Sequence, residues 1–259
     1  MILQFASDLH LEFSANAEYI QKHPLEPCAD TLILAGDITY LNDKYLSHSI
    51  FDQWSRDYKE VYIVPGNHEF YGKHFPVSGV FPYLNIEVRS NIRYLNNQTI
   101  YLGGIRILFT TLFSHINKEK SLEIEYYIRD FHGTRYSEDS MLPLTINQFN
   151  QCHQDCLAYL KSEMDKPFYG KTVIVSHFAP FNKKWIKDYP FFPHDFSAFF
   201  HADLEWMCES YKIDHWISGH THIHFESFKI CNTWMSSNMM GYVERSEHQK
   251  FNNQKLIET

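Results

Sequence analysis

The sequence predicts an α/β fold, and three of its features support this prediction. Five short apolar runs, of four to six residues each, are typical of strands that are buried on both faces of a sheet. Helically spaced apolar residues lie between the second and third runs, as in a β–α–β crossover. Metal-binding residue types follow every run, and ligands of open α/β sheets bind beyond the carboxyl ends of the strands. The runs span residues 2–7, 31–36, 61–66, 172–176 and 215–219.

The first half of the chain is rich in predicted strands. Between the second and third runs, residues 40–58 carry apolar side chains at helical spacing, so we expect a helix that connects two strands. Gly103 and Gly104 are typical of a hairpin turn between two later strands. The later strands are expected at 92–95, 99–104 and 105–112.

The second half alternates charged segments with apolar ones. Residues 117–140 are charged and are expected to be irregular, whereas 145–161 read as a helix with Thr145 as its N-cap. The remaining elements are a loop rich in Pro and Phe at 178–200, a helix around 202–211, strands near His215 and Phe225, and a polar C-terminal tail that is expected to fray.

Length and charge restrict the class of protein. The 259 residues, 44% of them hydrophobic, show no linker, repeat or low-complexity segment, so we expect a single domain over 1–259. The formal net charge is −8 without a stripe of Lys and Arg. Sequence-independent binding to duplex nucleic acid is therefore disfavoured, because neutralised phosphates supply most of its affinity.

The cysteines and the N-terminus predict a cytoplasmic protein. Five cysteines without a C-x-x-C pair fit free thiols better than a disulfide framework. Cys152, His153 and Cys156 could form a metal site, although packed thiols on one helix are the commoner arrangement. The N-terminus lacks the basic region of a signal peptide, and no run of about 18 apolar residues predicts a transmembrane helix.

The polar residues after the five runs have the chemistry of a metal centre. Two pairs of them are spaced i, i+2, which places both side chains on one side of an extended backbone. A carboxylate can bridge two ions, so this set suffices for two adjacent divalent sites with one shared ligand. A ligand set without thiolate favours Mn, Fe or Zn, and paired ions can activate a bridging hydroxide. The candidate ligands are Asp8, His10, Asp37, Asn67, His177, His220 and His222.

Five motifs in this order resemble those of the calcineurin-like metallophosphoesterases: SDLH, AGD, PGNHE, VSH and GHTH. The resemblance covers residues 8–222. It implies a four-layer αββα sandwich of two mixed sheets flanked by helices, and hydrolysis of a small phosphate monoester or diester, such as a nucleotide. It further implies that Asp37 bridges two ions and that His68 acts on the leaving oxygen or the phosphoryl oxyanion. One ion would be held by Asp8, His10 and His222, and the other by Asn67, His177 and His220.

Some segments depart from the family patterns. Protein phosphatases of the superfamily carry an Arg shortly after the G-D pair, whereas this chain reads GDITYLN, which disfavours a phosphoprotein substrate. The segment SSNMMGY resembles N-P-x-G-Y with Met239 in place of Pro, and Asn238 could be structural. Glu12 and Glu69 flank two motifs and are expected to form hydrogen bonds beside the ligands.

Two other classes of function share these motifs. A metal-dependent nuclease would need a basic groove or a dimerisation segment, and neither is evident in the sequence. A non-catalytic scaffold on the same fold would be expected to lose ligands, whereas all seven positions and His68 are intact. Oligomeric state is not predicted by the sequence.

Two segments are expected to cover the metal site and to select the substrate, because loops on a rigid scaffold commonly carry specificity. These segments are 117–140 and 178–200. Packing is the commoner role of such aromatic residues, but here they could stack on a base or aryl group, and the cations could meet a further phosphate. The aromatic residues are Phe178, Phe181, Trp185, Tyr189, Phe191 and Phe192, and the cations are Arg129, Arg135, Lys183 and Lys184.

Overall fold

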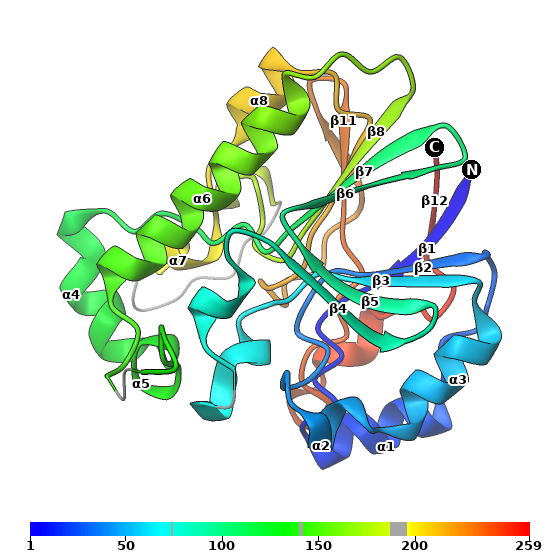
Figure 1. Ribbon diagram of the computed structural model, residues 1–259, viewed down its shortest axis with the longest axis horizontal. Coiled ribbons are helices and arrows are strands. Elements are labelled where there is room, and N and C mark those ends of the chain that lie inside the picture. Colours follow the sequence, from blue (N-terminus) through cyan, green and yellow to red (C-terminus); the bar gives the residue numbers. More distant parts are fainter. Residues whose placement is uncertain (74, 140–141, 187–195) are drawn as a thin grey trace.

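The computed structural model describes residues 1–73, 75–139, 142–186 and 196–259, and the strands in these ranges form two six-stranded sheets (Figure 1). The first sheet has the order β12-β1-β2-β3-β5-β4. Its strands are β1 (Ile2–Ala6), β2 (Thr31–Leu34), β3 (Glu60–Ile63), β4 (Leu84–Arg89), β5 (Ile92–Asn96) and β12 (Leu256–Glu258). The second sheet has the order β10-β11-β9-β8-β7-β6. Its strands are β6 (Gln98–Leu102), β7 (Ile105–Thr110), β8 (Lys171–Ser176), β9 (His215–Ile217), β10 (Phe228–Ile230) and β11 (Thr233–Ser236).

Each sheet is mixed in the same way. Four parallel strands form its centre, and one antiparallel strand borders each edge. The register pairs Phe5 with Ile33 and Ile33 with Tyr62, so β1, β2 and β3 run side by side. Their carboxyl ends therefore open onto one edge, and those of β8 and β9 open onto the corresponding edge of the other sheet.

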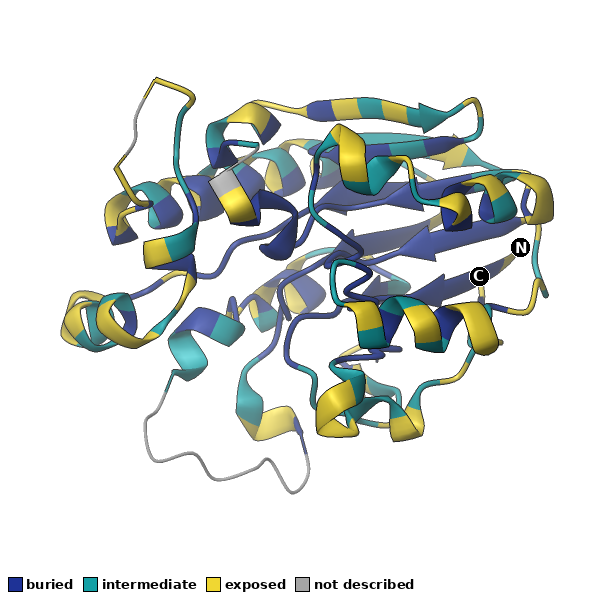
Figure 2. Ribbon diagram, turned by 90° about the horizontal axis from the view of Figure 1, so that it is seen from below, coloured by how far each residue is buried: buried dark blue, intermediate teal, exposed yellow. Residues whose placement is uncertain are grey.

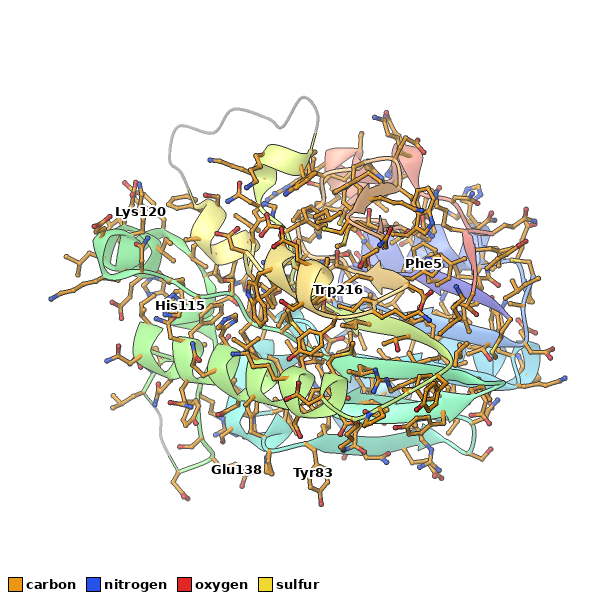
Figure 3. The ribbon with its side chains drawn as sticks, turned by 90° about the horizontal axis from the view of Figure 1, so that it is seen from above. Phe5, Tyr83, His115, Lys120, Glu138 and Trp216 are labelled. Atoms are coloured by element: carbon orange, nitrogen blue, oxygen red, sulfur yellow. The ribbon has the colours of Figure 1, made fainter. Side chains whose placement is uncertain are left out.

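The two sheets pack face to face over a shared hydrophobic core. Phe5 and Ile33 of the first sheet belong to the same buried cluster as Ile107 and Val175 of the second. Because side chains alternate along a strand, their neighbours point to the opposite, outer faces. Figure 3 labels Phe5 and Trp216 in the interior and Tyr83 at the periphery.

Helices cover the outer face of each sheet, which completes four layers. On the first sheet, Leu32 and Leu34 share a buried cluster with Phe51 and Trp54 of α3. Helices α6 and α8 lie over the second sheet (Figure 1), and exposed residues are concentrated on the outward sides of the helices (Figure 2). The helices are α1 (Ser14–Lys22), α2 (Asp43–Leu46), α3 (Ser49–Asp57), α4 (Lys118–Tyr127), α5 (Asp130–Gly133), α6 (Ile146–Met164), α7 (Ser197–Phe200) and α8 (Glu205–Ser210). The predicted sandwich of two mixed sheets flanked by helices is confirmed.

Several predicted elements agree with the structure. Thr145 caps α6 in a reciprocal capping box with Gln148. Gly103 and Gly104 adopt φ of 55° and 81° in the turn between β6 and β7, a conformation that favours glycine. In the described ranges, no helix is both long and apolar enough to cross a bilayer.

Other predictions were wrong in detail. The helix expected over 40–58 is two helices, α2 and α3, since the side chain of His48 caps a new start at Ser49. Residues 117–140 are not irregular, because α4 and α5 form there and bury Ile124 and Phe131. The C-terminal tail does not fray either, because β12 pairs with β1 and buries Ile257.

Candidate metal centre

The structure brings all seven candidate ligands together, and we call this set the ligand cluster. Each side chain follows a strand of the two sheets. Asp8 and His10 follow β1, Asp37 follows β2, Asn67 follows β3, His177 follows β8, and His220 and His222 follow β9. Six of these residues are buried and His222 is 13% exposed at its side chain. The polar residues after the five runs therefore lie close together in space.

The backbone at the cluster is unusual. Five ligand residues adopt left-handed φ angles between 47° and 72°, a region that non-glycine residues seldom occupy: Asp8, His10, Asp37, His220 and His222. Such conformations cost about 1–3 kcal/mol each and concentrate at functional sites. Both i, i+2 pairs, Asp8 with His10 and His220 with His222, are therefore turned, and the extended backbone predicted for them is wrong.

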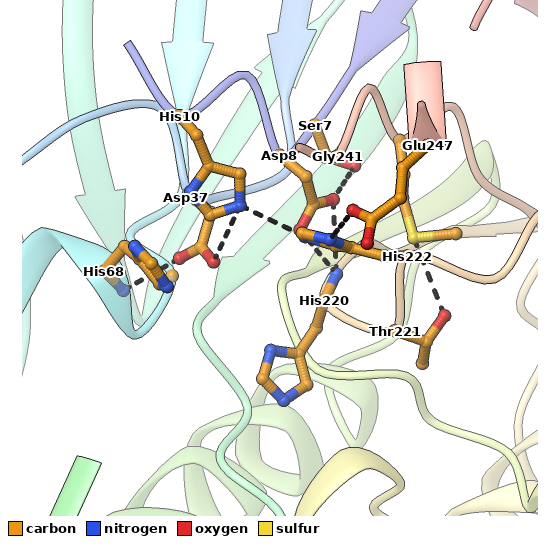
Figure 4. A network of polar contacts seen from close by, with 12 residues as sticks. Ser7, Asp8, His10, Asp37, His68, His220, Thr221, His222, Gly241 and Glu247 are labelled. Carbon is orange, nitrogen blue, oxygen red and sulfur yellow. Dashed lines mark hydrogen bonds and ion pairs between the residues drawn. The ribbon is translucent and has the colours of Figure 1, made fainter. Parts of the chain in front are cut away.

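Four ligand residues form the first half of the cluster (Figure 4). Ligand atoms of Asp8, His10, Asp37 and His222 all lie within 4.8 Å of one another. The Nε2 atoms of His10 and His222 are 3.1 Å apart, and His222 Nε2 is 3.3 Å from Asp8 Oδ1. His10 Nε2 lies 3.7 Å from Asp37 Oδ2.

Asp37 also belongs to the second half of the cluster. Ligand atoms of Asp37, His177 and His220 lie within 4.8 Å of one another. His177 Nε2 is 3.4 Å from Asp37 Oδ1 and 3.1 Å from Asn67 Oδ1. His220 Nδ1 is 3.2 Å from the same His177 nitrogen. The two carboxylate oxygens of Asp37 thus face opposite halves of the cluster.

Hydrogen bonds around the cluster orient the imidazole rings. Glu12 lies 3.1 Å from His10 Nδ1, the Ala35 carbonyl 3.0 Å from His177 Nδ1, and Glu247 2.7 Å from His222 Nδ1. With Nδ1 donating outward, the Nε2 lone pair of each ring points into the cluster, as in metal-binding histidines.

The donor set fits divalent metal ions. It contains imidazole nitrogens and carboxylate and amide oxygens, with no thiolate. Inward-facing ring nitrogens at 3.1–3.2 Å from one another would repel as lone pairs unless a proton or a cation lies between them. Among the residues that the structure describes, none forms a hydrogen bond with the buried His220 Nε2, so no such bond fixes the tautomer of this ring.

Carboxylates make two of these histidines basic. Burial alone would lower the pKa of His222, but hydrogen bonds to Asp8 and Glu247 outweigh it and raise the pKa to about 10. For His177, burial is outweighed by Asp37, which raises the pKa to about 9. Positive charge is therefore favourable at both halves of the cluster, and a metal ion would replace these protons.

The amide of Asn67 is oriented by a buried chain of hydrogen bonds. Its Nδ2 donates to the Tyr71 hydroxyl at 3.2 Å, and that hydroxyl donates to Asp130 Oδ2 at 2.6 Å. The amide oxygen is thereby directed toward His177 and the cluster. Sequence reasoning missed both residues, because Tyr71 belongs to none of the five motifs and Asp130 lies far from Asn67 in the chain.

Glu69 links the AGD motif at Asp37 to its own motif, PGNHE, through hydrogen bonds. It accepts backbone hydrogen bonds from Gly66 at 2.7 Å, Ile38 at 2.9 Å and Asp37 at 3.1 Å. Burial, followed by the charge of Asp37, raises the pKa of Glu69 to about 8. A Cβ atom at Gly66 would lie 2.2 Å from Asp37 Oδ1. The close approach of the segment after β3 to the segment after β2 therefore requires glycine at position 66. The predicted hydrogen-bonding role of Glu69 is confirmed.

His68 lies beside the cluster and is held from both sides. Its Nδ1 is 2.8 Å from the same Glu12 oxygen that contacts His10, which confirms the hydrogen bonding expected of Glu12. Its Nε2 is 3.2 Å from the Tyr242 hydroxyl. Burial would lower the pKa of His68, but Asp37 and Glu12 outweigh it and raise the pKa.

A pocket of about 330 Å³ opens beside His68, and we call it the His68 pocket. Six of its residues were not anticipated as site residues, namely Phe13, Asn16, Tyr71, Tyr242, Glu244 and Arg245. Tyr242 lies in the SSNMMGY segment that the sequence singled out without a role. The pocket is lined by Phe13, Asn16, His68, Tyr71, Arg129, Tyr242, Glu244 and Arg245.

Asn238 of the same segment has a structural role. Its Nδ2 donates to the carbonyls of Phe5 and Asn252. It therefore ties the end of β1 to the C-terminal segment.

The other predicted site features lie apart from the cluster. Cys152 and Cys156 are buried free thiols and His153 contacts the Phe113 carbonyl, so within the described residues no metal-binding group includes them. Trp185 lines a separate hollow of about 400 Å³ that contains none of the candidate ligands.

The aromatic residues of 178–200 are divided between the core and the cluster. Phe178 and Phe181 are fully buried, and the ring of Phe178 lies 4.1 Å from that of His220. Tyr189, Phe191 and Phe192 lie outside the described residues. Of the predicted cations, Arg129 lines the His68 pocket, whereas Arg135 contacts the Glu138 carbonyl and Lys184 lies 4.0 Å from Glu205.

The fold and the cluster define a metal-dependent hydrolase of phosphoric esters. The chain belongs to the calcineurin-like phosphoesterase family, whose pattern matches residues 3–224. It contains the cluster of metal-binding residue types at the strand ends of the two sheets. The predicted family and enzyme class are confirmed.

Similar proteins extend over nearly the whole chain. An uncharacterized protein of Acanthamoeba polyphaga mimivirus is 28% identical over 272 residues, covering 97% of this chain and 94% of the relative. The solved structure of the phosphopantetheinyl hydrolase of Mycobacterium tuberculosis matches with a TM-score of 0.72 at 19% identity, covering 98% of this chain and 95% of that one. A Thermus thermophilus structure matches with a TM-score of 0.50 at 11% identity, covering 92% and 88%. At these identities the structural matches support the fold alone.

Proposed function

We propose that the ligand cluster binds two divalent transition-metal ions, Mn, Fe or Zn, and that the protein uses them to hydrolyse small phosphate monoesters or diesters. The observation that carries this proposal is the position of Asp37, whose Oδ2 faces His10 and whose Oδ1 faces His177. In this assignment Asp37 binds both ions. Asp8, His10 and His222 hold one ion, and Asn67, His177 and His220 hold the other.

When the two metal ions are bound, they would supply an activated water and stabilise charge on the phosphoryl group. The chain contributes the geometry. Glu12, the Ala35 carbonyl and Glu247 fix three ligand rings, so little reorganisation accompanies the reaction.

His68 is proposed to donate a proton to the leaving oxygen. Its Nδ1 is held by Glu12, and its Nε2 faces Tyr242 in the His68 pocket. The raised pKa favours the protonated imidazole, as a general acid requires. A leaving group in the pocket could therefore replace the Tyr242 hydroxyl as the partner of His68 Nε2 and receive its proton.

The size of the His68 pocket favours a small substrate. About 330 Å³ lies at the lower end of the range of small-molecule sites, which is roughly 300–1,000 Å³. The net charge of −8 disfavours a long nucleic acid.

The test is a comparison of three substrates with the metal-loaded protein. We expect release of p-nitrophenolate from p-nitrophenyl phosphate or its phenyl diester, loss of that release with a chelator, and little cleavage of single-stranded DNA. Preferential cleavage of the DNA would instead identify a nuclease. Failure to turn over any of the three with both ions bound would identify a non-catalytic scaffold.

A further inference from the structure

Two arginines from separate parts of the chain line the His68 pocket. Arg129 directly precedes α5, and Arg245 ends the short 3-10 helix η4 (Val243–Arg245). The pocket thus carries two guanidinium groups in addition to His68, although the protein as a whole is acidic.

Each guanidinium lies over the ring of a tyrosine that belongs to the site. Arg129 Cζ is 5.4 Å from the centre of the Tyr71 ring, and Arg245 Cζ is 4.9 Å from that of Tyr242. Both tyrosines contact the proposed machinery, since Tyr71 bonds to Asn67 and Tyr242 to His68. Stacking orders a planar guanidinium while leaving its N–H edges available to a ligand.

The charges of these two arginines are not neutralised by a close ion pair within the described ranges, although Arg245 acts at longer range on Glu247 and helps to lower its pKa. There, Arg129 and Arg245 have no carboxylate within 4.0 Å, whereas Arg89 pairs with Asp52 at 2.6 Å and Arg93 with Glu87 at 3.1 Å. Glu244 also lines the pocket, but it is solvent-exposed. Exposed guanidiniums held over rings beside a proposed phosphate site are suited to bind a second anion.

We propose that Arg129 and Arg245 bind a second phosphate of the substrate, one that is not hydrolysed. This inference rests on the proposed function, because it takes the ligand cluster as the site of the scissile phosphate. The substrate class is then a small bisphosphorylated molecule, and the pocket volume of about 330 Å³ limits the size of the spacer between its two phosphates. An aromatic spacer would meet Phe13 and Tyr242, whose rings lie 5.5 Å apart in the same pocket.

The test compares two ligands that differ in one phosphate. Binding of thymidine 5′-phosphate and thymidine 3′,5′-bisphosphate, each as a non-hydrolysable phosphonate analogue, to the metal-loaded protein is measured by calorimetry. We expect the bisphosphate to bind about tenfold more tightly or better, as charge-assisted hydrogen bonds to arginine imply. In the double variant Arg129→Gln/Arg245→Gln, the ratio of the two affinities should fall close to one.

A matched control removes a guanidinium that is remote from the pocket. Arg93→Gln loses the surface pair with Glu87 and should keep the wild-type ratio. Equal affinities in the wild type, or a ratio that survives in the double variant, would overturn the inference. Because the ratio is a binding measurement, it is independent of turnover. Hydrolysis without a preference contradicts the arginine site alone, whereas a preference without hydrolysis of any ester contradicts the proposed function.

Discussion

The ligand cluster and the His68 pocket lie side by side but are built differently. The ligands follow strands of two packed sheets, and Asp8, His10 and His177 are completely buried. Arg129 and Arg245 are instead exposed, and they lie next to a one-turn helix and at the end of a 3-10 turn. The groups that would meet the reacting phosphate are thus fixed by the scaffold, while the groups that would select the substrate can vary without disturbing it.

The largest expected effect comes from the residue that joins the two halves of the cluster. Asp37→Ala should lose both ions and reduce turnover by about 10³-fold or more, because metal ions contribute several kcal/mol to such reactions. Elemental analysis and phosphatase assays measure the two effects. Retention of both ions by the variant would contradict the shared role of Asp37.

Replacement of His68 should separate catalysis from metal binding. His68→Asn should keep the metal content and lower turnover by about 10²–10⁴-fold, the usual contribution of a general acid. The loss should be greater for phenyl phosphate than for p-nitrophenyl phosphate, since p-nitrophenolate scarcely needs a proton. Equal losses for the two esters would indicate that His68 binds or stabilises the phosphoryl group instead.

Glu69 tests how far the rigidity of the cluster depends on buried hydrogen bonds. In the wild type, backbone N–H groups donate to both carboxyl oxygens of Glu69. In Glu69→Gln, the NH₂ group that replaces one oxygen would face at least one of these donors and could not accept from it. The free energy of unfolding should fall by about 1–3 kcal/mol. Chemical denaturation provides the measurement, with Glu18→Gln on the exposed face of α1 as the control, which should change it by less than about 0.5 kcal/mol. Equal stability of the two variants would show that Glu69 does not hold the motifs together.

Tyr242 lies at the boundary between the two regions and should have the smallest effect. Tyr242→Phe removes the hydroxyl that contacts His68, while Glu12 still holds the ring. Turnover should fall by less than about tenfold, in line with one hydrogen bond. Tyr83→Phe, a peripheral change, should have no effect. A loss as large as that of His68→Asn would place Tyr242 among the reacting groups.

The sequence predicts the cluster far better than its surroundings, for a physical reason. Each ligand directly follows a buried strand, so local patterns locate it and the sheet topology assembles the set. Contacts such as His68 with Tyr242, 174 residues apart, depend on how the C-terminal segment packs and leave no local pattern. The same limit applies to Asp130 and to β12, whose three residues become a strand through pairing with β1.

A crystal structure of the metal-loaded protein with anomalous scattering would show directly whether two ions share one carboxylate. We predict two peaks about 3.5–4 Å apart, as in other two-metal sites, with Asp37 between them. One ion should contact Asp8, His10 and His222, and the other Asn67, His177 and His220. A single peak, or two ions that do not share Asp37, would contradict the bridging role of Asp37.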